Sequence, residues 1–99
     1  MKIWIDDVRT PPSGYVWVKS VNEAVELIQK AIKRNTHIDI IDIDHDAGDY
    51  ATDGGDYIRV LDWLEMMGYE YPIRIHSMNP VGVHNMRTII EKNGWREIR

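Results

Sequence analysis

The stretch IDIIDIDHDAGDYATDGGD, residues 38–56, decides both the fold and the position of the chemistry. Its first part is apolar enough to form a strand that is buried on both faces of a sheet. Its second part is acidic: the stretch contains seven aspartates, and residues 35–58 contain no Lys or Arg. Carboxylates without cationic partners repel one another. Their concentration after a buried strand therefore indicates a site at the end of that strand.

The elements around this stretch predict a single α/β domain over residues 1–99, with a mostly parallel, five-stranded sheet. Apolar and β-branched runs predict the strands, and apolar stripes with helical spacing predict the helices. Ser20 and Asn79 suit helix N-caps, while Gly68 and Gly94 suit helix ends. We expect strands at residues 2–5, 15–18, 37–43, 72–76 and 95–98, and helices at residues 21–34, 54–67 and 80–93.

The connection between the first two expected strands is short. Parallel strands need a crossover of about a dozen residues or more. Only about nine residues, including Pro11 and Pro12, join these two strands. Either an extended, proline-rich crossover replaces a helix, or the two strands pair in antiparallel orientation.

Polar side chains follow three of the expected strands at the point where each strand ends. Asp6 and Asp7 follow the first strand, Asp44 and His45 follow the third, and His76 is the last residue of the fourth. Ligands bind beyond the carboxyl ends of the strands in open parallel sheets, so we expect these groups to share one rim. Asp6, Asp7 and Asp44 would hold a divalent cation there, with Mg²⁺ favoured and Mn²⁺ or Ca²⁺ as alternatives.

Such a cation, together with the other groups at this rim, predicts chemistry on a phosphate. Asp44 is a cation ligand, a nucleophile or a base that activates water, and either His45 or His76 is the general acid. Arg9 either grips the phosphate bidentately or forms a local ion pair. Helix N-termini attract anions. Ser77 and Asn79 precede the N-terminus of the third expected helix, and we expect them to bind the phosphate there.

Composition excludes several classes of protein. The chain has no Cys, which excludes disulfides and thiolate metal sites. Its N-terminus, MKIWIDD, becomes acidic too early for a signal peptide or a membrane span, so we expect a cytoplasmic protein without a membrane partner. The net charge is −4 and no basic stripe is present, which argues against a nonspecific nucleic-acid surface.

Three boxes of the sequence are similar to those of one known family. They are DDVRTPP at residues 6–12, DHDAG at residues 44–48 and HSMNPVG at residues 76–82. In this order they resemble the cyclic-phosphate-processing receiver-like family, a divergent form of the response-regulator receiver fold. The resemblance implies a flavodoxin-like, three-layer sandwich that lacks the helix after strand one. It also implies a role in processing cyclic phosphates on RNA ends or nucleotides.

The third expected strand also resembles the receiver strand that ends in a phosphoacceptor aspartate, which Asp44 would match. The sequence departs from these patterns at two places. Ala47 follows the DHD triplet where the family usually has a bulky apolar residue, and the last expected strand, WREIR, has no Lys that could hold a phosphoryl group. The second departure argues against ordinary phospho-relay signalling.

Three functions are compatible with these observations. The first is a metal-dependent phosphoesterase that acts on the cyclic phosphate of a small nucleotide or an RNA end. The second is a non-catalytic, receiver-like regulatory module that senses a phosphorylated ligand or a partner protein. The third is an interaction protein whose acidic face mimics nucleic acid.

Overall fold

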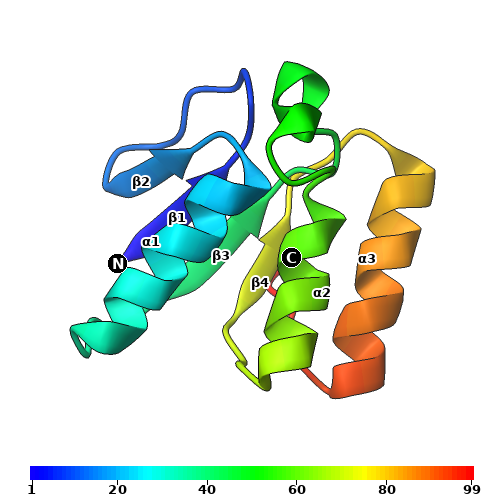
Figure 1. Cartoon of the computed structure of the whole chain (residues 1–99). Helices are drawn as coiled ribbons and strands as arrows, with labels where there is room; N and C mark the ends of the chain where they lie inside the picture. Colours follow the sequence, from blue (N-terminus) through cyan, green and yellow to red (C-terminus); the bar gives the residue numbers. More distant parts are fainter.

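Four strands form the sheet of this protein: β1 (Lys2–Ile5), β2 (Tyr15–Val18), β3 (Ile40–Ile43) and β4 (Ile73–Ile75). The computed structural model describes residues 1–99. The strand order is β2-β1-β3-β4, and every neighbouring pair is parallel (Figure 1). The structure therefore confirms the expected α/β fold with a parallel sheet.

The chain also forms the helices α1 (Val21–Lys33), α2 (Ile58–Met67) and α3 (Pro80–Asn93), and the short 3-10 helix η1 (Gly48–Thr52). Both predicted N-caps are present. The Ser20 hydroxyl accepts a hydrogen bond from the Glu23 N–H at 3.1 Å, and the Asn79 side chain accepts one from the Gly82 N–H at 3.0 Å. The second helix begins at Ile58, later than expected, because residues 54–57 form turns in which Gly54 and Gly55 have positive φ values of +112° and +94°. None of these helices combines the length and the apolarity that crossing a membrane requires.

All three α-helices cover the same face of the sheet (Figure 1). The core lies between these layers, since Ile3 and Ile5 belong to one cluster with the buried side chains of the helices. Successive side chains of a strand point to opposite faces, so Trp4 and its neighbour across the ladder, Asp42, point to the other face. The domain therefore has two layers, where the resemblance implied three. The reason is that neither residues 6–14 nor residues 95–99 form a helix that could cover the second face.

The connection from β1 to β2 is an extended crossover, which settles the alternatives left open by the sequence. The two strands pair in parallel, so antiparallel pairing is wrong. Residues 6–14 contain no helix. An extended chain of this length reaches about 30 Å, more than enough to return along strands of about 13 Å. The Trp4 indole N–H donates to the Arg9 carbonyl at 2.8 Å, so the crossover runs over the face opposite the helices.

Residues 95–98 form only an isolated bridge, and the prediction of a fifth strand there is wrong. The Ile73 N–H donates to the Arg96 carbonyl at 3.0 Å, and the Ile98 N–H donates to the Ile73 carbonyl at 2.8 Å. These two bonds involve a single residue of β4 and do not continue along it. The segment therefore follows the edge of β4 without extending the ladder.

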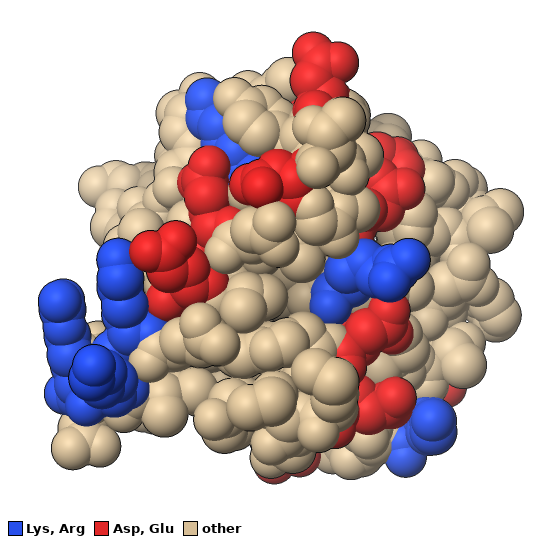
Figure 2. Space-filling model, in the orientation of Figure 1, with Lys and Arg blue, Asp and Glu red and all other residues tan.

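The face that the helices cover carries both acidic and basic side chains (Figure 2). Basic side chains gather at the lower left of the view, over the C-terminal end of α1, where Lys30 and Lys33 lie in the last turn. Cations at this position interact favourably with the helix dipole. Acidic side chains are spread over this face, and several lie in the upper part of the view, where η1 and the carboxyl ends of the strands are found. This end of the molecule contains the candidate site.

Candidate active site

Three carboxylates converge at the carboxyl edge of the sheet. Asp6 and Asp7 follow β1, Asp44 follows β3, and these two strands are neighbours. One oxygen atom from each of the three side chains lies within 4.8 Å of the others. Asp6 is fully buried and Asp44 is 8% exposed. The structure thus brings together the three residues that the sequence predicts as cation ligands.

The environments of Asp6 and Asp7 shift their pKa values in opposite directions. Burial acts to raise the pKa of Asp6, but hydrogen bonds from the backbone N–H groups of Arg9 and Val8, both 2.9 Å long, and from His76 hold this pKa below its usual value. Burial raises the pKa of Asp7, and the negative charges of Asp6 and Asp44 raise it further. Asp7 is therefore the member of this cluster whose charged form is least favoured.

Three carboxylate oxygens as close as these could hold a small divalent cation. Ligand oxygens at about 2.0–2.1 Å from an octahedral Mg²⁺ are about 2.9–4.1 Å from one another, and the oxygens of Asp6, Asp7 and Asp44 lie within 4.8 Å of one another. Carboxylate oxygens are the ligands that hard cations prefer. A bound cation would also offset the repulsion that raises the pKa of Asp7. Asp6, Asp7 and Asp44 therefore fit a Mg²⁺-type ion.

Arg9 contacts two members of this cluster. Its Nη1 atom lies 3.8 Å from an oxygen of Asp6 and 3.8 Å from an oxygen of Asp44, and it donates to the His76 carbonyl at 2.9 Å. One guanidinium and the His76 imidazole thus face three carboxylates. The Arg9 side chain is 45% exposed, so it also remains accessible to a ligand at the rim.

Gly48 and Tyr57 close the site on the side of η1. Gly48 has a φ of +55°, and a Cβ atom there would collide with the Asp7 carboxylate, so only glycine fits without displacement. Tyr57 is fully buried, and its hydroxyl donates to the Lys19 carbonyl at 2.7 Å. Burial, followed by the charge of Asp7, raises the pKa of Tyr57. The sequence analysis does not single out Tyr57, although its position just after the acidic loop was an available signal.

His76 lies between two buried carboxylates. Its Nε2 atom is 2.9 Å from an oxygen of Asp6, and its Nδ1 atom is 2.6 Å from an oxygen of Asp42. The ring stacks on Trp4 with a centroid separation of 3.9 Å and an angle of 6° between the planes. A ring that carries hydrogen on both nitrogens satisfies both carboxylates. Neither nitrogen is left for a substrate. His76 is instead placed to hold the Asp6 carboxylate in a fixed orientation.

Asp42 is the site residue whose direction the sequence did not decide. It is fully buried, and its Oδ2 atom has no hydrogen-bond partner. The nearest cation on that side is Arg74, whose Nη1 atom is 3.8 Å from Oδ2. The sequence carried a signal for this placement, because Asp42 and Asp44 are two residues apart on one strand run and so point to the same face.

His45 lies beside the start of α3. A Cβ atom on Gly82 would collide with the His45 ring, so glycine at this helix position makes room for the histidine. The His45 Nδ1 atom is 2.9 Å from an oxygen of Asp46, which leaves Nε2 without a protein partner. The His45 N–H donates to Asp44 at 2.8 Å. His45 is thus joined to the cation cluster through its backbone, and it has one free ring nitrogen.

Ser77 and Asn79 shape the start of α3. The Ser77 hydroxyl accepts from the Asn79 N–H at 3.1 Å, so its own hydrogen stays available to a ligand. The Asn79 side chain caps the helix through Gly82, and its amide donates weakly to Asp46 at 3.3 Å. The Ser77 hydroxyl therefore has a free donor for a phosphate, whereas the Asn79 amide already contacts Asp46.

The fold and this rim define a class of protein: a receiver-like α/β domain with carboxylates at the ends of β1 and β3. The cyclic-phosphate processing receiver domain family matches residues 1–92 of the 99-residue chain. The chain therefore belongs to this family, as the three sequence boxes predict. No curated protein and no solved structure gives a significant match.

Proposed function

We propose that this protein is a metal-dependent phosphoesterase that opens cyclic phosphates on nucleotides or RNA ends. The observation that supports this most directly is the group formed by Asp6, Asp7 and Asp44, whose oxygens lie within 4.8 Å of one another. Membership of the cyclic-phosphate processing receiver domain family points to the same substrate class. The proposed cofactor is Mg²⁺, with Mn²⁺ and Ca²⁺ as alternatives.

Each group at the rim has a role in this proposal. A bound cation shields the phosphate charge and polarises a phosphoryl oxygen. Arg9 and the Ser77 hydroxyl orient the phosphate, with Asn79 at the same helix N-terminus. A water molecule attacks in line and gives its proton to Asp44, so that one P–O bond forms while the ring P–O bond breaks. His45 protonates the leaving oxygen, since His76 has both nitrogens engaged.

Hydrolysis of 2′,3′-cyclic nucleotides tests this proposal. We expect turnover with Mg²⁺, no turnover with EDTA, and a loss of turnover in Asp44→Asn. Asp62→Asn is the matched control, because Asp62 is an exposed residue of α2 outside the cluster. Turnover that survives both chelation and Asp44→Asn would overturn the proposed mechanism.

A regulatory module is the second candidate, and the placement of Asp44 favours it. Asp44 follows β3 directly, where receiver domains carry a phosphoacceptor, and its side chain is 11% exposed. In this alternative, Asp44 accepts a phosphoryl group, or the same rim binds a phosphorylated ligand, without turnover. Intact mass after treatment with acetyl phosphate separates the candidates, because a stable adduct on Asp44 without hydrolysis of cyclic phosphates favours the module.

A further inference from the structure

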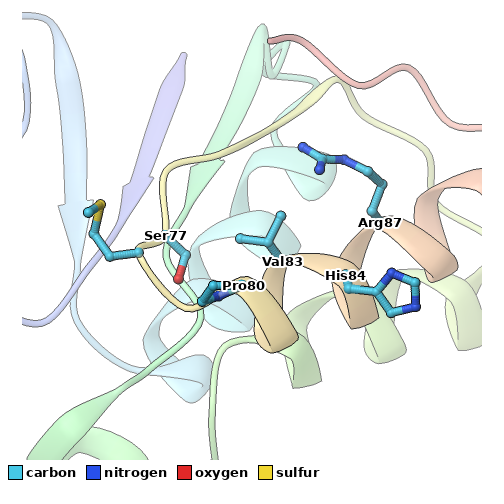
Figure 3. A pocket seen from close by; sticks show the side chains of 6 residues that line it. Ser77, Pro80, Val83, His84 and Arg87 are labelled. Atoms are coloured by element: carbon cyan, nitrogen blue, oxygen red, sulfur yellow. The ribbon is translucent and has the colours of Figure 1, made fainter.

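A pocket of about 460 Å³ lies beside the acidic rim, between the end of β4 and the first turns of α3 (Figure 3). Its wall begins at Ser77, the residue after His76. Arg9, which contacts the acidic cluster, donates to the carbonyl of the peptide bond that joins His76 to Ser77. Arg9 therefore connects the cluster of Asp6, Asp7 and Asp44 to the peptide bond at which the pocket wall begins. The lining residues are Ser77, Met78, Pro80, Val83, His84 and Arg87.

Apolar and polar groups occupy different parts of the pocket wall. Pro80 and Val83 lie between Ser77 on one side and His84 and Arg87 on the other (Figure 3). Small-molecule sites have this construction, with an apolar surface and a few polar groups that fix orientation. The volume also falls in the range of such sites, about 300–1,000 Å³. The wall thus suits a ligand with an apolar face and polar edges.

The charge of the pocket selects a neutral ligand. The Arg87 guanidinium uses Nε and Nη2 to bind Glu97, with contacts of 2.9 and 2.6 Å. This bidentate pair occupies two of the guanidinium nitrogens and leaves Nη1 as a free donor. The Glu97 carboxylate, which also contacts Arg99 at 3.2 Å, would repel a second phosphate at Arg87. A flat, neutral heteroaromatic ring can instead lie against Val83 and accept hydrogen bonds at its edge.

We propose that this pocket holds the nucleobase of a nucleotide whose phosphate lies at the cluster of Asp6, Asp7 and Asp44. This inference rests on the proposed phosphoesterase function and assigns the surface that recognises the base of its substrate. The substrate is a nucleotide or the terminal nucleotide of an RNA, and not the cyclic phosphate of a simple polyol, which lacks an apolar face. Val83 and His84 are then residues that determine specificity.

Binding and turnover together test the inference. The binding probes are adenosine 3′-monophosphate and glycerol 1-phosphate, and the turnover probes are the cyclic phosphates 2′,3′-cyclic AMP and glycerol 1,2-cyclic phosphate. Val83→Phe fills the pocket and should weaken binding of the nucleotide at least about tenfold, with little change for glycerol 1-phosphate. Val81→Phe is the matched control, because Val81 is on the same helix, is 70% exposed and does not line the pocket. His84→Ala, at an exposed lining position, should weaken nucleotide binding without a change in stability.

The outcomes separate this inference from the proposed function. Equal turnover of both cyclic phosphates, unaffected by Val83→Phe and His84→Ala, would overturn the base pocket and leave the phosphoesterase proposal intact. Absence of any turnover, with nucleotide binding that still depends on Val83 and His84, would overturn the phosphoesterase proposal and support the pocket. Equal binding of the two monophosphates in every variant would also overturn the pocket.

Discussion

His76 and Asp42 are joined by a contact of 2.6 Å between Nδ1 and Oδ1 on the side of the sheet that the helices leave uncovered. The other ring nitrogen is 2.9 Å from Asp6. A fully buried aspartate is thus linked through one imidazole to a proposed cation ligand. Groups that orient a ligand without touching the cation still contribute to its affinity.

Asp42→Asn should therefore weaken cation binding. The amide lacks the charge that holds the His76 ring, so Asp6 loses a firmly oriented partner. We expect the affinity for Mn²⁺ to fall by about 10–100-fold, as measured by electron paramagnetic resonance of free Mn²⁺. Asp62→Asn, on the exposed side of α2, should not change it. An unchanged affinity in a folded Asp42→Asn variant would mean that Asp42 serves only the fold.

Replacement of the two histidines should separate chemistry from cation binding. His45→Gln should lower kcat by about 10²–10⁴-fold, the usual contribution of a general acid, and leave Mn²⁺ affinity unchanged. His76→Gln should lower Mn²⁺ affinity because Asp6 loses its donor. His37→Gln is the control, since His37 is an exposed residue ahead of β3. The reverse pattern would assign the acid to His76 and the supporting role to His45.

Asp7→Asn should stabilise the protein when no cation is present. Burial and the charges of Asp6 and Asp44 raise the folded-state pKa of Asp7 above its ordinary value of 3.8. A raised folded-state pKa gives stability that is present below the unfolded-state pKa and is lost as the pH rises through the folded-state pKa. At neutral pH in EDTA, the variant should therefore exceed the natural protein by about 0.5–2 kcal/mol.

Urea unfolding at several pH values checks this prediction for Asp7. The gain in the free energy of unfolding should shrink as the pH falls through the folded-state pKa of Asp7, which lies above its ordinary value of 3.8. Mg²⁺ should stabilise the natural protein by mass action and the variant less. A variant that gains nothing in EDTA would show that the three carboxylates do not strain the fold.

The sequence predicted the rim well because strand ends are a local property. Asp6, Asp7 and Asp44 follow apolar runs directly, and parallel pairing of neighbouring strands is enough to bring them together. Ser20 and Asn79 likewise predicted where α1 and α3 begin, and Gly68 and Gly94 predicted where α2 and α3 end. Short-range signals failed where the outcome depends on packing: residues 95–98 have the composition of a strand, but only one bridge to Ile73 forms.

Other features of the structure depend on contacts between residues far apart in the sequence, which the spacing of residues along the chain does not predict. The three-layer expectation came from the resemblance, while the layer count depends on residues 6–14 and 95–99, which contain no helix. Whether a histidine has a free nitrogen depends on carboxylates far along the chain, and this distinguishes His76 from His45. The role of Gly48 depends on the approach of Asp7 from another loop.

A pair of glycine variants tests whether η1 belongs to the site. Gly48 and Gly68 both have positive φ, +55° and +72°, but a Cβ atom collides with Asp7 only at Gly48, while nothing lies within 4 Å at Gly68. Alanine at either position should lower the free energy of unfolding by about 1–2 kcal/mol, the cost of a left-handed residue with a side chain. Only Gly48→Ala should also displace Asp7 and reduce Mn²⁺ affinity. The backbone cost is common to both variants, so comparison with Gly68→Ala isolates the effect of the collision with Asp7. Equal Mn²⁺ affinities in the two variants would show that η1 does not shape the cluster of Asp6, Asp7 and Asp44.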